Sequence, residues 1–180
     1  MCCLPIITLG KIDIRVDYYT IVAETPQELD EQLSLNSRNG YSADTKWSIN
    51  TGYRFKNTNF GCQLDDSKIE LKIIYTMPEW SNKNESSTEL QELWDTWYKD
   101  LLKHEENHGF HGRQAYNEIK QNLYVSHNAN NCAQLTTNLK VLVDRILFKY
   151  SQEDKYYDER TNHGETEGAS IRFSINSYAE

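Results

Sequence analysis

Two histidines four residues apart, with a glutamate directly after the first, form an HExxH motif at His104, Glu105 and His108. On a helix, side chains at this spacing come within about 6 Å, so both imidazoles can reach one Zn²⁺ ion at about 2.0 to 2.1 Å. Glu105 lies about 100° around such a helix from His104, off the ion but near a water bound to it. Zinc lowers the pKa of its bound water to about 7, so Glu105 is the candidate general base for hydrolysis of a peptide or amide bond.

A catalytic zinc site takes a third protein ligand, and the sequence offers several. The longer motif HExxHxxGxxH does not fit, because positions 111 and 114 hold His111 and Gln114. His111 shares the helix face, but ligands at i, i+4 and i+7 of a straight helix must converge over about 10 Å of rise. Residues 157–164 are expected to form a polar turn near the chain's end, which offers His163 and the carboxylates of Asp158 and Glu159. On the residues alone the order of preference is His163, His111, Asp158, and Asp158 could instead accept the second N–H of a ligating histidine.

The motif is predicted to lie on a long helix from about residue 88 to about residue 124. Apolar residues recur there at steps of three and four, and the same stripe continues through the histidines: Leu90, Trp94, Trp97, Leu101, His104, His108, His111, Ala115 and Ile119. The histidines are therefore expected to point into the core, where an unsatisfied polar group costs roughly 1 to 3 kcal/mol. The alternative, a solvated helix whose His and Glu pair only with neighbours, does not explain why the histidines lie on the apolar face.

The rest of the chain predicts a sheet in the N-terminal half, followed by helices. Alternating apolar and polar residues predict strands over 11–23, 45–55 and 68–77. A capping pattern at Thr25 predicts a short helix over about 26–35. A second long helix begins near Cys132, and a short final strand is expected around Phe173. The second helix is indicated by a stripe of Leu135, Leu139, Leu142, Ile146 and Tyr150. This order predicts an α+β fold in a single domain over residues 1–180, with residues 1–10 flexible at the N-terminus.

The composition of the chain disfavours certain classes of binding partner. The net charge of the 180 residues is −8 and no basic run offsets it, which disfavours nucleic acid or an anionic membrane surface. The apolar opening Cys2–Ile7 is too short to cross a bilayer and no basic residue precedes it, so neither a membrane span nor an export signal is expected. Cys62 and Cys132 stand alone and far apart, so a long-range disulfide and two buried thiols both remain open.

The ordered set of short motifs resembles the bacterial DUF922 family over about residues 16–168. The motifs are Thr45-Lys46-Trp47, Cys62, Tyr75-Thr76-Met77-Pro78-Glu79-Trp80, Trp94, the HExxH string, Cys132, Tyr157-Asp158 and Thr161-Asn162-His163-Gly164. This resemblance implies a secreted or periplasmic zinc-dependent protease with His104, His108 and His163 as ligands and Glu105 as the catalytic residue. It also places cysteines near positions 62 and 132. The chain departs from the family after His163, where Ser170-Ile171-Arg172-Phe173 stands in place of an expected Gln and Trp.

The sequence therefore predicts a zincin-like fold, in which a twisted N-terminal sheet packs on two long helices and the first helix carries the motif. The predicted function is zinc-dependent hydrolysis of a peptide or protein substrate, with Zn²⁺ as the cofactor. One alternative is a non-catalytic module closed by four ligands, His104, His108, His111 and His163, and another is a hydrolase of non-peptide amides. The phenol of Tyr156 or Tyr157 could donate to an oxyanion. The predicted location is periplasmic or secreted by resemblance, and otherwise cytoplasmic.

Overall fold

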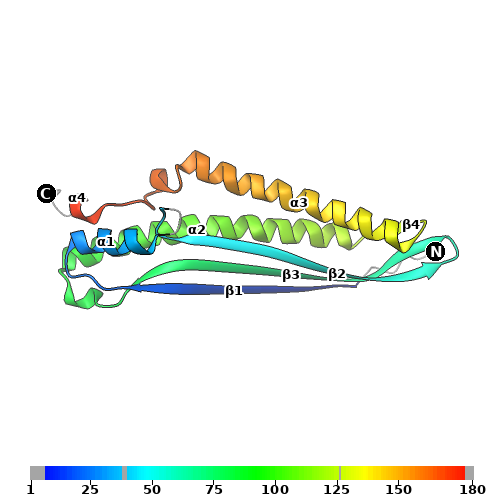
Figure 1. Ribbon diagram of the computed structural model, residues 1–180, viewed down its shortest axis with the longest axis horizontal. Helices are drawn as coiled ribbons and strands as arrows, with labels where there is room; N and C mark the ends of the chain where they lie inside the picture. Colours follow the sequence, from blue (N-terminus) through cyan, green and yellow to red (C-terminus); the bar gives the residue numbers. More distant parts are fainter. Residues whose placement is uncertain (1–6, 38–39, 126, 177–180) are drawn as a thin grey trace. The chain divides into compact units, whose positions relative to one another are not determined.

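A computed structural model describes residues 7–37, 40–125 and 127–176 of the protein. Strands come first in the chain and long helices follow (Figure 1), which confirms the predicted α+β class. The elements are β1 (Ile7–Ile21), α1 (Pro26–Asn36), β2 (Asp44–Thr58), β3 (Gly61–Trp80), a 3-10 turn (Lys83–Glu85), α2 (Thr88–Leu123), β4 (Asn128–Ala129), α3 (Cys132–Thr161), a second 3-10 turn (Glu165–Glu167) and α4 (Phe173–Asn176). Within these residues, no helix has the length and apolar content needed to cross a membrane.

The strand order in the sheet is β1-β3-β2, so β3 is central and the long strands β1 and β2 lie at the edges among the described residues. The short strand β4 pairs antiparallel with the beginning of β3, with Cys62 opposite Ala129. β4 comes so close to Gly61 that a Cβ atom there would lie 2.2 Å from the backbone oxygen of Ala129, and Gly61 has a φ of +123°. Only glycine suits this turn between β2 and β3.

Contacts within the chain define two compact units, each built from three stretches. Unit 1 takes Met1–Ile14, Trp47–Ile73 and Phe110–Asp154, and unit 2 takes Arg15–Lys46, Ile74–Gly109 and Lys155–Glu180. The single domain over residues 1–180 stays a prediction. Of the N-terminal segment expected to be flexible, residues 1–6 lie outside the described residues, and residues 7–10 already belong to β1.

Both units pack a strand closely against α2. In unit 1 a Cβ atom on Gly112 would lie 2.7 Å from the Trp47 ring of β2, and in unit 2 one on Gly109 would lie 2.0 Å from the Tyr75 hydroxyl of β3. These two glycines let side chains of the sheet lie directly against the backbone of the helix. The sheet and the first long helix therefore form adjacent layers in each unit, as the sequence predicts.

An aromatic cluster fixes the first half of α2 in unit 2. Trp94 packs on Trp80, Trp97 and Phe173 with ring centroids 5.4, 4.9 and 5.8 Å away. Both indole N–H groups that flank it are satisfied by backbone oxygens, from Trp80 to Ala23 and from Trp97 to Ala169, each at 3.0 Å. Trp94 and Trp97 are therefore core residues that hold the helix in place, as predicted from their positions on its apolar stripe.

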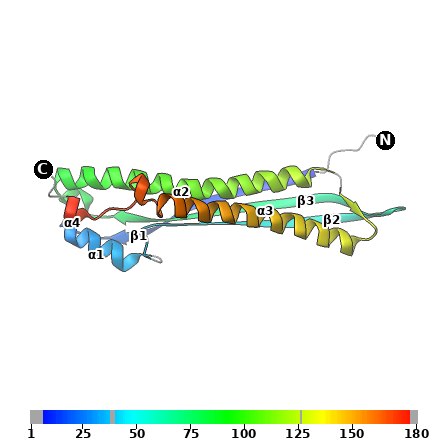
Figure 2. The same cartoon turned by 90° about the horizontal axis from the view of Figure 1, so that it is seen from above.

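Two expectations for the C-terminal part are wrong. The helix α3 continues to Thr161, so Tyr157 and Asp158 lie on its last turns instead of in a loop. The segment around Phe173 is the short helix α4 rather than a strand. The Asp30 carboxylate of α1 accepts the backbone N–H groups of Phe173 and Ser174 at 2.8 and 3.0 Å, and this capping satisfies them without a strand partner. Figure 2 shows α4 beside α1.

Cys62 of β3 and Cys132 of α3 form a disulfide in unit 1, which decides between the two readings of these cysteines. The bridge joins residues 70 apart in the chain. Closing a loop of that length lowers the entropy of the unfolded chain and stabilises the fold by about 4 kcal/mol. The tie holds the beginning of α3 to the sheet.

Removing this disulfide is expected to lower the free energy of unfolding by about 2 to 4 kcal/mol, because the unfolded chain regains its loop entropy. Urea unfolding of the Cys62→Ala/Cys132→Ala variant, followed by circular dichroism, measures the loss. Dithiothreitol should lower the midpoint of the wild-type chain toward that of the double variant and leave the double variant unchanged. A wild-type midpoint that resists full reduction of the bridge would contradict the prediction.

Candidate metal centre

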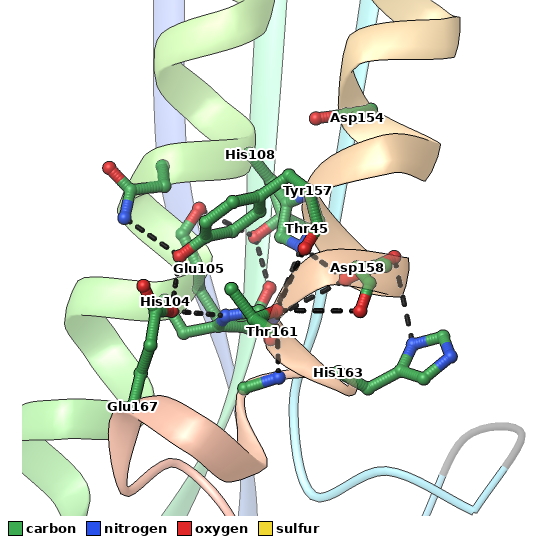
Figure 3. A network of polar contacts seen from close by, with 12 residues as sticks. Thr45, His104, Glu105, His108, Asp154, Tyr157, Asp158, Thr161, His163 and Glu167 are labelled. Carbon is green, nitrogen blue, oxygen red and sulfur yellow. Dashed lines mark hydrogen bonds and ion pairs between the residues drawn. The ribbon is translucent and has the colours of Figure 1, made fainter.

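The two histidines of the HExxH motif are buried in unit 2, as their place on the apolar stripe of α2 predicts. His104 is 4% exposed and His108 is 8% exposed. Their rings lie edge to face with centroids 4.9 Å apart, and their Nε2 atoms are 3.3 Å apart. Figure 3 shows both rings turned toward the last turns of α3. The motif therefore presents two nitrogen donors to one point inside the unit.

Asp158 brings a carboxylate oxygen to the same point. Its Oδ1 lies 3.0 Å from Nε2 of His108 and 3.4 Å from Nε2 of His104. The three donor atoms form a triangle with sides of 3.0, 3.3 and 3.4 Å. Ligand atoms at 2.0 to 2.1 Å from a tetrahedral zinc ion are about 3.3 Å from one another. The three side chains are thus spaced as three corners of a zinc coordination sphere, and the group could hold a metal ion.

The other side of the His104 ring is held by Glu167 and Tyr157. Nδ1 of His104 lies 3.1 Å from Oε2 of Glu167. The same oxygen accepts the Tyr157 hydroxyl proton at 2.5 Å, and that hydroxyl accepts from Asn107 Nδ2 at 2.8 Å. The Tyr157 ring also stacks on His104 at 4.9 Å. Because an ionised carboxylate only accepts, Nδ1 carries the proton that faces Glu167, and Nε2 is the ring nitrogen that faces His108 and Asp158.

The pKa values of His104, Asp158 and Glu167 are shifted by the hydrogen bonds that join these side chains. Burial alone would lower the pKa of His104, but its hydrogen bonds to Asp158 and Glu167 outweigh burial and raise the pKa above the usual histidine value. Burial would raise the pKa of Asp158, but hydrogen bonds from His104 and His108 hold it well below its usual range. The pKa of Glu167 is also lowered: burial acts against the shift, and the bonds from Tyr157 and His104 exceed it. Without an ion, the imidazoles therefore compensate the charge of Asp158.

Glu105 lies beside this group with a different partner. Its side chain is 5% exposed, and its Oε2 accepts the Thr45 hydroxyl proton at 2.5 Å. Thr45 stands near the beginning of β2, so the sheet positions this carboxylate. Burial raises the pKa of Glu105, while the Thr45 hydrogen bond and the nearby imidazoles oppose that shift only in part. Glu105 is thus next to the donor triangle without forming one of its corners.

A tight turn at residues 162–164, directly after α3, packs against the His104 ring. Asn162, His163 and Gly164 have φ angles of 48°, 52° and 84°. The Gly164 N–H donates to Thr161 Oγ1 at 3.1 Å. A Cβ atom on Gly164 would lie 3.0 Å from Cγ of His104 and 2.7 Å from the Cβ of Ala169. Position 164 therefore requires glycine for two reasons: its backbone is left-handed, and it lies directly against the His104 ring.

His163, the third ligand preferred from the sequence, lies on the other oxygen of Asp158. Its Nδ1 is 3.7 Å from Oδ2 of Asp158, and its ring stacks on Tyr41 with centroids 4.4 Å apart. The side chain is 41% exposed. Within the described residues, the donor group around His104 comprises His104, His108 and Asp158. His163 as a ligand therefore stays a prediction, and in this geometry it is a neighbour of the third donor.

His111, the other histidine considered, belongs to unit 1 and is held by Asp154 of α3. Its Nδ1 lies 2.6 Å from Oδ1 of Asp154, whose second oxygen accepts the Trp47 indole N–H at 2.8 Å. The pair shows that a carboxylate satisfies this imidazole.

Three residues of the network are absent from the predicted site: Thr45, Asn107 and Glu167. Thr45 and Asn107 lie within the quoted motifs, but nothing in their spacing tells that they would bond to Glu105 and Tyr157. Glu167 follows the left-handed turn at residues 162–164, which returns the chain to His104, and no periodic pattern in the sequence predicts such a return. The Tyr157 hydroxyl donates to Glu167, and the oxyanion role considered for Tyr157 stays a prediction. Tyr156 is 59% exposed.

Comparison with protein families gives one assignment. The family described as "Bacterial protein of unknown function (DUF922)" matches residues 16–164. The match spans every residue of the donor triangle and most of the chain, so this protein belongs to the DUF922 family. Comparisons with curated proteins and with solved structures found no match. The resemblance of the motifs to this family is confirmed, and its description assigns no activity.

Replacing Gly164 by alanine is expected to displace the His104 ring and lower Zn²⁺ affinity by roughly tenfold or more, because the new Cβ would overlap the ring and Ala169. Gly168→Ala is the matched control. Gly168 also has a positive φ of 83°, but its Cβ would meet the mobile end of Asp100 at 2.8 Å. Both variants should lose about 1 to 2 kcal/mol of stability from backbone strain. Equal zinc affinity in the two variants, measured by competition with a chromophoric chelator, would contradict the placement of Gly164.

Proposed function

We propose that this protein is a zinc-dependent metallopeptidase, with His104, His108 and Asp158 as zinc ligands and Glu105 as the general base. The observation that carries the proposal is the donor triangle, whose sides of 3.0, 3.3 and 3.4 Å match the spacing of ligands around tetrahedral zinc. Glu105, which directly follows the first ligand in the chain, is buried beside it and forms no corner of the triangle. This division between ligands and a separate carboxylate is typical of hydrolytic zinc sites.

The donor set favours zinc over other common ions. Two imidazole nitrogens and one carboxylate oxygen suit Zn²⁺, whereas Ca²⁺ and Mg²⁺ prefer oxygen ligands alone. Glu167 supports this choice, since an acceptor on the far nitrogen of a ligating histidine fixes its tautomer and orientation. His163 gives similar support to Asp158 through the second oxygen of that carboxylate.

Three protein ligands leave the fourth tetrahedral position available to water or substrate. A zinc ion held by these three ligands would lower the pKa of a water bound at the fourth position and would polarise a substrate carbonyl. Glu105 would take the proton of the attacking water and later deliver it to the leaving amine. Thr45 would hold the Glu105 carboxylate in place through its hydroxyl. A position left to water would favour an enzyme over a module closed by four ligands, and peptide bonds are the substrate class proposed from the motif.

The proposed location is the periplasm or the outside of the cell. The Cys62–Cys132 disulfide supports it, since such bonds form and persist in oxidising compartments.

Substitution of Asp158 and of His163 separates the two candidates for the third ligand. Asp158→Asn is expected to weaken Zn²⁺ binding by roughly a hundredfold, because the charged corner of the triangle is lost. His163→Ala should weaken binding by less than about tenfold, as expected for a partner of a ligand. Zinc content after dialysis and affinity by chelator competition measure both effects, with thermal unfolding of the metal-free variants as a check on folding. The opposite ranking would support His163 as the ligand, and no loss in either variant would rule out this site.

Glu105→Gln tests the catalytic part of the proposal. The variant should keep its zinc but lose turnover by at least about a hundredfold, because the amide cannot take a proton from water. The neighbouring Glu106→Gln is the matched control, since Glu106 is exposed. Cleavage of a pooled peptide library, followed by mass spectrometry, measures turnover without a known substrate. Full activity in Glu105→Gln would remove Glu105 from the mechanism, and zinc-loaded wild-type protein that cleaves no peptide would contradict the peptidase assignment.

A further inference from the structure

The strand β1 is a long edge of the sheet with one described partner strand. It runs from Ile7 to Ile21 and pairs with β3, so its other edge is free within the described residues. A free edge presents unpaired backbone N–H and C=O groups and is a template for another strand. No proline interrupts these 15 residues. Length and regularity therefore make β1 suitable for pairing along most of its course.

The even-numbered side chains of β1 form an apolar stripe that the fold covers only in part. Ile12, Ile14, Val16 and Tyr18 are 44%, 40%, 39% and 56% exposed. Solvent-facing apolar side chains that follow one another along a strand lose water when a further strand is added beside them. The stripe gives a hydrophobic contribution to pairing at this edge.

The odd-numbered side chains carry charges of alternating sign. Lys11, Asp13, Arg15 and Asp17 are all exposed, and Arg15 contacts Asp17 within the strand at 3.0 Å. Charges on an edge strand commonly prevent pairing, because like charges meet across the ladder. Here the signs run plus, minus, plus, minus, and this order favours pairing with a second copy of the same strand. It is complementary to itself when read in the antiparallel direction.

We propose that two copies of this chain form a symmetric dimer by antiparallel pairing of β1 with β1, centred on Ile14. In this register Lys11 faces Asp17 of the second copy and Asp13 faces Arg15 of the second copy, and the two-fold axis repeats both pairs. On the apolar face, Ile12 lies opposite Val16 and Ile14 lies opposite Ile14. Cross-strand pairs of opposite charge and of β-branched residues each stabilise a sheet.

The neighbouring registers are disfavoured by the same charges. A shift of the pairing by two residues in one direction places Asp13 opposite Asp17 and Arg15 opposite itself. The shift in the other direction places Lys11 opposite Arg15 and Asp13 opposite itself. Like charges directly opposite destabilise a ladder, so the charges separate the proposed register from its two nearest neighbours. The resulting interface is isologous, as closed dimers require.

Charge reversal tests this pairing in the full chain by sedimentation velocity. The wild-type chain should sediment as a dimer at micromolar concentration. Asp17→Lys and Lys11→Asp should each weaken dimerisation by about tenfold or more, because each creates two like-charge contacts. An equimolar mixture of these two variants should dimerise as tightly as the wild type, because every contact between unlike chains is again of opposite charge. The altered side chains are exposed, and circular dichroism checks that each variant is folded.

A second measurement locates the symmetry axis. In a Cys2→Ser/Cys3→Ser background, Ile14→Cys should form an intermolecular disulfide on mild oxidation, since opposite Cβ atoms lie about 5 Å apart. Ile12→Cys should not, because its copies would lie four residues apart along the ladder, about 13 Å. The proposal is overturned by a wild-type chain that is monomeric up to 100 µM, by a mixture that does not restore dimerisation, or by equal cross-linking at the two positions.

Discussion

The convergence of two imidazole nitrogens and one carboxylate oxygen within 3.4 Å of one another is the constraint around which unit 2 is organised. These polar atoms come from buried or half-buried side chains, where each needs a partner to offset its loss of water. Helix α2 supplies the imidazoles and the end of α3 supplies Asp158. The turn at Gly164 presses against His104, and Glu167 returns to bind its second nitrogen. Segments far apart in the chain therefore meet at this one point of unit 2.

The part of the site on α2 was predictable and the part beyond it was not, for a physical reason. The burial of His104 and His108 follows from one helical period that begins at Leu90, and a local pattern fixes which way each side chain points. The third donor comes from another helix 50 residues further along the chain, where several polar side chains compete. The positions of Asp158 and His163 depend on where α3 ends. Because the helix continues to Thr161, Asp158 faces inward and His163 falls on the left-handed turn behind it.

The positions of the strands could also be predicted from a local pattern, whereas their ends depend on the surrounding structure. Alternation predicted strands over 45–55 and 68–77, and the structure extends them to Asp44–Thr58 and Gly61–Trp80. Their ends are set by pairing and by the turn at Gly61, which intrinsic preference does not encode. At Phe173 the context reverses the prediction. Apolar alternation there resembles a strand, but the Asp30 carboxylate caps the first N–H groups of a helix instead.

The third donor decides the net charge that the site would have with a zinc ion bound. That charge can be compared with the charge distribution of the metal-free side chains. Two neutral imidazoles and the Asp158 carboxylate reduce the charge of a bound Zn²⁺ to about one, and Glu105 nearby balances what remains. A set of three neutral histidines would leave both positive charges of the ion on its ligand sphere, to be balanced only by carboxylates that do not bind it, which is harder to accommodate out of water. The pKa of His104 is raised by its carboxylate partners and that of Asp158 is lowered by its imidazoles, so the metal-free network already favours positive charge at this point. A site that attracts a proton in this way has the electrostatics to hold a cation in its place.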